Sequence, residues 1–285
     1  MSGADISSRS GISAHEYGAA WAAATAALEA GDLAAARTLA TSIADRSHAP
    51  GLERRYGRAK HLLARIARAA GDPAAAEEAL RAALRAFTFL EDASGAADVL
   101  TDLAEVRLAA GQFGDASDLS RQAVKRAPGN VRALTVLGYA QWLSGSPADG
   151  ESTFEQALHI RRDAVAALCG RGQVRADLGD HRDALTDLDR ALRLGVPAAE
   201  EADVRSARAL ALAGLGNLPD ADAEITRAVE LDPNRARTRL RRARIRSLAG
   251  RLEEAFGDLQ EVLSFGAAPV ETATARRALA RLRTL

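Results

Sequence analysis

The chain has 285 residues with 38 basic and 38 acidic side chains, so its formal net charge is zero, and no global field would draw the whole molecule onto nucleic acid or an acidic membrane. Hydrophobic residues make up 47% of the sequence but aromatic residues only 4%. Alanine and leucine favour helix, whereas the residues that favour strands are scarce, so the composition indicates a folded, helical protein.

The N-terminal residues and the single cysteine narrow the class of protein further. Residues 1–13 are polar and rich in glycine and serine, without the basic start and apolar run of a secretory signal. No stretch approaches the roughly 20 apolar residues of a membrane helix. We expect a disordered tail over 1–13 and a cytoplasmic protein. Cys169 stands alone, which excludes an intramolecular disulfide and a multi-cysteine metal site.

A short motif recurs along the chain, in which small or apolar residues precede a glycine and a polar residue follows it. The seven glycines, in chain order, are Gly31, Gly71, Gly111, Gly145, Gly179, Gly216 and Gly250. Their spacings are 40, 40, 34, 34, 37 and 34 residues. Seven copies at this period are far beyond chance and predict an array of structural repeats.

Each glycine lies between two segments with helical periodicity. A glycine at this place ends the first helix in a left-handed conformation, and prolines such as Pro73 and Pro147 stand near the start of the next helix, where a missing N–H costs nothing. Turns that contain Pro128 and Pro233 then stop the second helix. The unit is therefore helix, tight turn, helix, proline turn. The two spacings of 40 predict longer helices in the first repeats.

This unit resembles the tetratricopeptide repeat, which has about 34 residues and conserves a large apolar residue, a Leu-Gly pair and small residues on its second helix. The best match is the segment that carries Leu134, Leu137 and Gly138 on its first helix and Phe154 and Ala157 on its second. The resemblance implies an all-α, right-handed solenoid of about seven helix pairs with a C-terminal capping helix.

We expect one solenoid domain over residues 14–285. Its repeats would lie near 17–50, 57–90, 97–130, 131–164, 165–198, 202–235 and 236–268, followed by a cap over 269–285. A polar-faced cap of this kind keeps the end of a solenoid soluble. The arginine- and alanine-rich composition, almost free of lysine, is similar to that of bacteria with GC-rich genomes such as actinobacteria.

The resemblance also implies that the first helices of the pairs line a concave groove where partners bind. Residues three and four apart share one helix face, so each first helix offers a stripe of side chains. The candidate groove residues are Arg58, His61, Arg65, Arg68, Asp98, Asp102, Glu105, Arg132, Thr135, Tyr139, Trp142, Arg237, Arg241 and Arg244.

Separate basic, acidic and aromatic patches suit an extended peptide or a partner's helix, and Tyr, Trp and Arg often dominate interface energies. The alternative is that the charges are solvated helix faces and the aromatic residues belong to the core. Relatives that clamp a C-terminal carboxylate use asparagine on consecutive first helices. The only asparagines here are Asn130, Asn217 and Asn234, all in expected turns, so that clamp is absent.

The segment 235–246 is the most unusual stretch, because arginine occupies slots that are apolar in the family. From residue 235 to the C-terminus there are twelve arginines and five acidic residues. We expect Arg239, Arg242 and Arg246 to reach acids on the preceding helix, at Asp220, Asp222 or Glu224. The alternative is an anion or nucleic-acid site, supplemented by Arg276, Arg277, Arg281 and Arg283. RNA recognition would want interleaved aromatic residues, and only Phe256 and Phe265 are present.

Catalysis finds no support in the sequence. The five histidines lack metal-ligand spacing, there is no phosphate-binding loop, and Cys169 has no base near it in sequence, so we assign no catalytic residue, metal or cofactor. We expect a non-catalytic scaffold or adaptor that binds a peptide or partner protein in its groove. Two alternatives stay open: anion or nucleic-acid binding through the arginine-rich C-terminal repeat, and a structural scaffold that self-associates.

Overall fold

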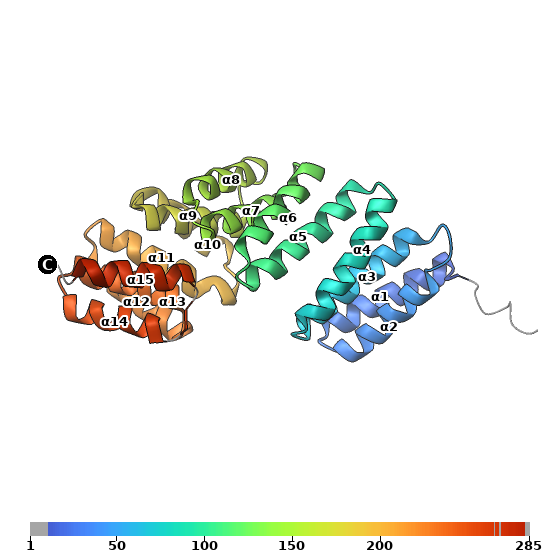
Figure 1. Ribbon diagram of the computed structural model, residues 1–285, viewed down its shortest axis with the longest axis horizontal. Coiled ribbons are helices and arrows are strands. Elements are labelled where there is room, and N and C mark those ends of the chain that lie inside the picture. Colours follow the sequence, from blue (N-terminus) through green and yellow to red (C-terminus); the bar gives the residue numbers. More distant parts are fainter. Residues whose placement is uncertain (1–10, 265, 268, 283–285) are drawn as a thin grey trace, which may run out of the picture. The chain divides into compact units, whose positions relative to one another are not determined.

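The computed structural model describes residues 11–264, 266–267 and 269–282, and these form fifteen helices joined by turns and loops. Figure 1 shows the helices following one another as antiparallel pairs. The chain divides into two compact units, Met1–Ala133 (unit 1) and Leu134–Leu285 (unit 2), and the division falls inside one helix. Each unit is described by itself.

Unit 1 contains six complete helices and the start of a seventh. They are α1 (Ala14–Glu29), α2 (Leu33–Arg46), α3 (Glu53–Ala69), α4 (Pro73–Phe89), α5 (Ala93–Ala109), α6 (Phe113–Arg126) and the beginning of α7 (Val131–Leu143). Unit 2 holds the rest of α7 and eight more helices. They are α8 (Pro147–Ile160), α9 (Val165–Leu178), α10 (His181–Leu194), α11 (Ala198–Gly214), α12 (Leu218–Leu231), α13 (Ala236–Leu248), α14 (Leu252–Ser264) and α15 (Pro269–Leu282).

Helices pack as consecutive pairs, and first helices such as α3, α5 and α11 lie against the second helix of their own pair and that of the pair before. In unit 1, α3 packs on α4 and also on α2; in unit 2, α11 packs on α12 and α10. Neighbouring first helices also meet, since α11 contacts both α9 and α13. This is the stacked helix-pair architecture of a solenoid, as the sequence predicts.

The seven recurring glycines all end the first helix of a pair. Each has a positive φ, between 71° at Gly71 and 104° at Gly179, a conformation that a residue with a Cβ adopts only at a cost. At three of these turns the polar residue after the glycine caps the next helix: the side chain of Asp32 accepts from the backbone of Ala35, that of Asp72 from Ala75 and that of Asn217 from Asp220. The predicted turn chemistry is confirmed.

The longer helices predicted for the first repeats are present. Helices α3, α4 and α5 each have 17 residues, whereas α6, α8 and α10 have 14. Between α4 and α5 the left-handed position is held by Glu91, with φ of 52°. This turn connects two helix pairs, and it could not be predicted from a glycine because the sequence has none there.

The glycine of the Leu-Gly pair in the best-matching repeat lies where α7 and α8 approach each other closely. A Cβ at Gly138 would lie 2.8 Å from Cε1 of Phe154, and one at Gly170 would lie 2.3 Å from its Cζ. Phe154 is fully buried and fills the space that the two glycines leave. Small residues at these contacts allow helices to approach closely.

The C-terminal helix α15 covers the last pair, as the sequence predicts. Ala275 and Leu279 are buried in one cluster with Ala243, Leu259 and Val262 of α13 and α14. The last three residues of the expected cap lie outside the described residues.

Most of the expected N-terminal tail also lies outside the described residues. Of its described part, Ile12 is buried and its amide donates to the carbonyl of Arg46 at 3.1 Å, while Ser13 caps α1 in a capping box with Glu16. None of the helices in the described ranges is both long and apolar enough to cross a membrane.

Candidate partner-binding surface

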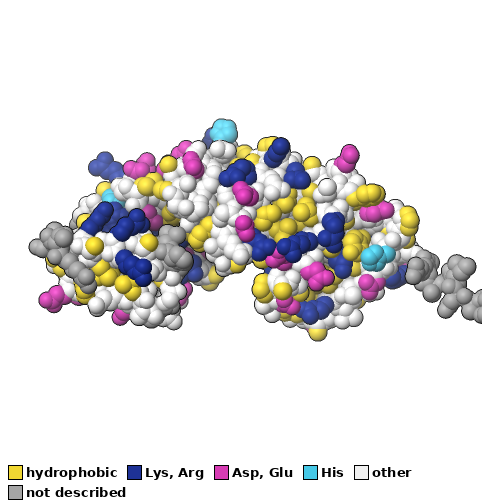
Figure 2. All heavy atoms as spheres, in the orientation of Figure 1, with side chains coloured by type: hydrophobic (Ala, Val, Ile, Leu, Met, Phe, Trp, Pro, Cys, Tyr) yellow, Lys and Arg dark blue, Asp and Glu magenta, His cyan; other side chains and the backbone are white. Residues whose placement is uncertain are grey.

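The predicted basic stripe of α3 and the predicted acidic stripe of α5 meet each other in unit 1. His61 Nε2 lies 2.5 Å from Asp102 Oδ2, and Arg68 lies 2.9 Å from Glu105. Arg132 lies 2.7 Å from Glu105 and hydrogen-bonds Asp102 as well. Figure 2 shows basic and acidic side chains next to one another over this region. Two residues of the basic stripe, His61 and Arg68, therefore contact two of the acidic stripe, whereas Arg58, Arg65 and Asp98 have no ion pair in the described part of the chain.

Asp102 is the centre of this network, with only 2% of the residue exposed. Its burial opposes ionisation and acts to raise the pKa of the carboxyl, but the hydrogen bond from His61 and the charge of Arg132 outweigh that effect and hold the pKa below its usual value. The carboxylate is thus charged at neutral pH and ties three first helices, α3, α5 and α7, together.

A cavity of about 500 Å³ opens beside this network and is bounded by α1, α3, the end of α4 and the start of α5. We call it the α3 cavity. Its apolar wall is formed by Trp21, Leu62 and Phe87, and two arginines of the predicted stripe, Arg58 and Arg65, line it. The Arg58 guanidinium lies 5.5 Å from the centre of the Trp21 ring. Arg65 is exposed and has no ion-pair partner among the described residues.

Acidic residues line the α5 side of the same cavity. Asp92 pairs with Arg54 at 2.7 Å, and exposed Asp98 accepts a hydrogen bond from Asn130 at 2.9 Å. Sequence reasoning included Asp98 but missed Trp21 and Phe87. The signal for Trp21 was available, since it is one of only two tryptophans and lies in a first helix that is otherwise mostly alanine.

The aromatic residues predicted for the groove of α7 are largely packed within unit 2. Trp142 is 9% exposed, and the Arg237 guanidinium lies over its ring at 4.6 Å. The hydroxyl of half-buried Tyr139 donates to the carbonyl of Ala166 at 3.2 Å, and its ring meets Phe154 edge-on at 5.1 Å. Burial raises the pKa of Tyr139 well above its ordinary value. Thr135, from the same stripe, is buried too.

The arginines predicted for the groove of α13 connect that helix to its neighbours. Arg241 is only 3% exposed, pairs with Asp177 of α9 at 3.0 Å and donates to the hydroxyl of Ser206 in α11 at 2.9 Å. Arg244 donates to the backbone carbonyl of Asp177 at 3.0 Å. Two of the three predicted residues on this helix therefore hold first helices together.

The expectation that Arg239, Arg242 and Arg246 reach acids on the preceding helix is wrong. All three pair with the following helix, α14: Arg239 with Glu261, Arg242 with Asp258, and Arg246 with Asp258 at 2.7 Å. These side chains leave α13 on the face that packs against the second helix of its own pair. Asp258, at 2% exposed, receives two guanidinium groups there.

The described residues contain no group of three His, Cys, Asp or Glu side chains that could hold a metal ion. Cys169 is fully buried, and burial raises the pKa of its thiol to about 12. A thiol with so high a pKa is not a nucleophile at neutral pH.

Known proteins share both sequence features and the fold of this chain. Sequence models of the tetratricopeptide repeat match residues 55–129 and, separately, 101–167, 169–221 and 206–272, while the chain matches none of the curated proteins. Among solved structures, it is similar to a tetratricopeptide repeat protein from Parabacteroides merdae, with a TM-score of 0.58 and 18% identity over 94% of this chain and 98% of that one. It is also similar to PilF of Pseudomonas aeruginosa, with a TM-score of 0.62 and 16% identity over 78% and 94% of the two chains.

Both structures share the fold, and the matching sequence models together cover more than half of the chain. Six of the seven glycine turns, from Gly71 to Gly250, and the close helix contact at Gly138 lie within the matched residues. The chain belongs to the tetratricopeptide repeat family.

Proposed function

We propose that this protein is a non-catalytic interaction scaffold that binds a segment of a partner protein on the first helices of its repeats, with the α3 cavity as its main site in unit 1. Membership of a family of interaction repeats supports the general role. The observation that carries the site is Arg65, an exposed arginine that has no ion-pair partner among the described residues and lines the same cavity as the apolar side chains of Trp21, Leu62 and Phe87.

The chemistry of the cavity defines the segment that it fits. Arg58 and Arg65 lie two helical turns apart on one face of α3 and offer planar donors to carboxylates. Between them, the wall formed by Trp21, Leu62 and Phe87 offers apolar surface to a side chain. A partner segment with an apolar residue and acidic neighbours would be complementary to this site.

The paired residues of the predicted groove have a supporting role in this proposal. Arg68, Asp102, Glu105 and Arg132 satisfy one another, and such a network fixes the spacing of the first helices. A preformed surface binds more tightly because less conformational freedom is lost on binding.

Affinity capture from a lysate of the native host, followed by mass spectrometry, tests the proposal. We expect a protein partner to be recovered with the wild-type chain and with Arg37→Ala/Arg162→Ala, which removes two exposed arginines elsewhere. The same partner should be lost from Arg58→Ala/Arg65→Ala. Retention of every partner by that variant would contradict the site, and recovery of nucleic acid alone or of the chain itself would favour the alternative functions.

A further inference from the structure

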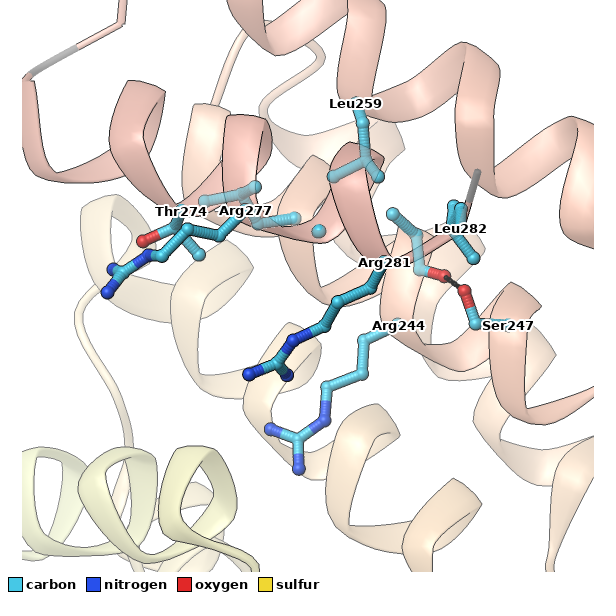
Figure 3. Close-up of a pocket in the computed structure, with 10 residues that line it drawn as sticks. Arg244, Ser247, Leu259, Thr274, Arg277, Arg281 and Leu282 are labelled. Atoms are coloured by element: carbon cyan, nitrogen blue, oxygen red, sulfur yellow. Dashed lines mark hydrogen bonds between the residues drawn. The ribbon is translucent and has the colours of Figure 1, made fainter. Parts of the chain in front are cut away.

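A second cavity, of about 530 Å³, lies in unit 2 between α13 and the capping helix α15 (Figure 3). Its lining is amphipathic. Leu240, Leu259 and Leu282 are among its apolar residues, and three arginines, Arg244, Arg277 and Arg281, bring positive charge to it. We call it the α13–α15 cavity.

The three arginines reach the cavity from two helices. Figure 3 shows Arg244 of α13 and Arg281 of α15 extending from their two helices in the same direction, while Arg277 lies one turn before Arg281 on α15. A carboxylate at the mouth of this cavity could therefore meet donors from two helices, and Arg presents such donors in a planar fork.

Two of the three arginines of this cavity, Arg244 and Arg277, have no carboxylate partner among the described residues, in contrast to the other arginines of α13. Arg241, Arg242 and Arg246 are each paired with a carboxylate. No acidic side chain lines the α13–α15 cavity in the part of the chain that the structure describes. In the same part, Arg277 has no carboxylate at ion-pair distance, and Arg244 is engaged by a backbone carbonyl only.

We propose that the α13–α15 cavity is a second binding site, and that it takes an acidic segment of a partner protein that carries a large apolar side chain. Carboxylates of the segment bind Arg277 and Arg244, and the apolar side chain enters between the leucines of α13, α14 and α15. The burial of that side chain and the charge-assisted hydrogen bonds act together. The site is independent of the α3 cavity, which lies in the other unit.

The lining favours a protein segment over nucleic acid. Single-stranded nucleic acids bind to positive grooves through stacking of their bases on aromatic side chains, and no aromatic side chain lines this cavity among the residues that the structure describes. The apolar floor would gain nothing from a phosphate backbone, whereas a leucine, isoleucine or phenylalanine of a peptide would be removed from water there.

The test uses the full chain and fluorescence anisotropy with defined probes: a labelled peptide of alternating glutamate and leucine, its glutamine–leucine counterpart, and single-stranded oligothymidine. We expect the glutamate–leucine peptide to bind, and Arg277→Glu to weaken it about tenfold or more. Arg276→Glu is the matched control, because it makes the same charge change one residue away on α15, at an exposed side chain that does not line the cavity. It should leave the affinity nearly unchanged.

Four results would overturn the proposal. The first is that the glutamate–leucine peptide does not bind, and the second is that the glutamine peptide or oligothymidine binds better than it. The third is that Arg276→Glu weakens binding as much as Arg277→Glu, a result that would indicate an effect of general positive charge and not of the cavity. The fourth is loss of the peptide by Arg58→Ala/Arg65→Ala and not by Arg277→Glu. That result would assign the acidic segment to the α3 cavity, so the two sites are distinguished by one set of variants.

Discussion

Glu91 has the left-handed backbone conformation that glycine has in the tight turns between the two helices of a pair. Its amide donates to the carbonyl of Thr88 at 3.1 Å and the next amide, of Asp92, to that of Phe87 at 2.9 Å. The same two bonds form at Gly111 and Gln112. Because Glu91 has φ of 52° and a Cβ, it carries a strain of about 1–2 kcal/mol that glycine would not.

We therefore expect Glu91→Gly to stabilise the protein by about 0.5–1 kcal/mol, since the relief of strain exceeds the extra chain entropy that glycine loses on folding. Gly111→Ala should destabilise it by about 1 kcal/mol for the opposite reason. Urea denaturation followed by circular dichroism measures both. A Glu91→Gly variant less stable than the wild type would show that the glutamate side chain makes a contact worth more than the strain.

Asp102 should make the stability of unit 1 depend on pH. Its pKa is lower in the folded chain than the usual value near 3.9, so its contribution is complete above that value and is lost as the pH falls through the folded pKa. Asp102→Asn should cost about 1–2 kcal/mol at neutral pH and progressively less below about pH 4. The comparison is Asp118→Asn, in an exposed pair with Arg121, for which we expect less than about 0.5 kcal/mol. A cost for Asp102→Asn that stays constant down to strongly acidic pH would argue against this account.

At the scale of the element, α13 is held to two other first helices by a buried arginine. Arg241 bonds Asp177 of α9 and Ser206 of α11, and its loss leaves buried polar atoms without a donor. We expect Arg241→Met to destabilise unit 2 by about 2–3 kcal/mol. Arg251→Gln removes an exposed pair with Asp222 and should cost less than about 0.5 kcal/mol. Equal midpoints of thermal unfolding for the two variants would contradict the structural role of Arg241.

The same helix marks the boundary of what sequence reasoning reaches. The glycine turns were predictable because a left-handed residue is a local requirement, visible as a glycine at a fixed period. The partners of Arg239 and Arg246 were not, because they depend on how far α13 is rotated about its axis relative to α14. The sequence pattern does not show which face of α13 packs against its neighbours, because arginine occupies positions that are usually apolar. The rotation of the helix could therefore not be predicted.

Part of each candidate site was likewise predictable from the sequence, and part depends on how the helices pack. The residues of the α3 stripe were predictable from their spacing, but the apolar wall of the α3 cavity includes Trp21 from the preceding pair and Phe87 from α4. A cavity between elements distant in sequence is a property of their packing. The α13–α15 cavity likewise needs the position of the capping helix, which brings Arg277 into the same lining as Arg244.

At the scale of the whole molecule, repeats that contact only their neighbours should respond locally to damage. The described part of α15 packs on α13 and α14, and Leu279 is buried against them. Leu279→Asp places a charge in that cluster and should remove the cap from the last pair at a cost of several kcal/mol. Amide hydrogen exchange should then accelerate in α13, α14 and α15.

The exchange of α2, α3 and α4 should stay as slow as in the wild type, because their cores share no buried residue with the C-terminal cluster. The matched control is Arg276→Asp on the exposed face of α15, which should change neither region. Faster exchange throughout both units in Leu279→Asp would mean that the chain unfolds as one cooperative body, and that the binding sites in the two units cannot be altered independently of each other.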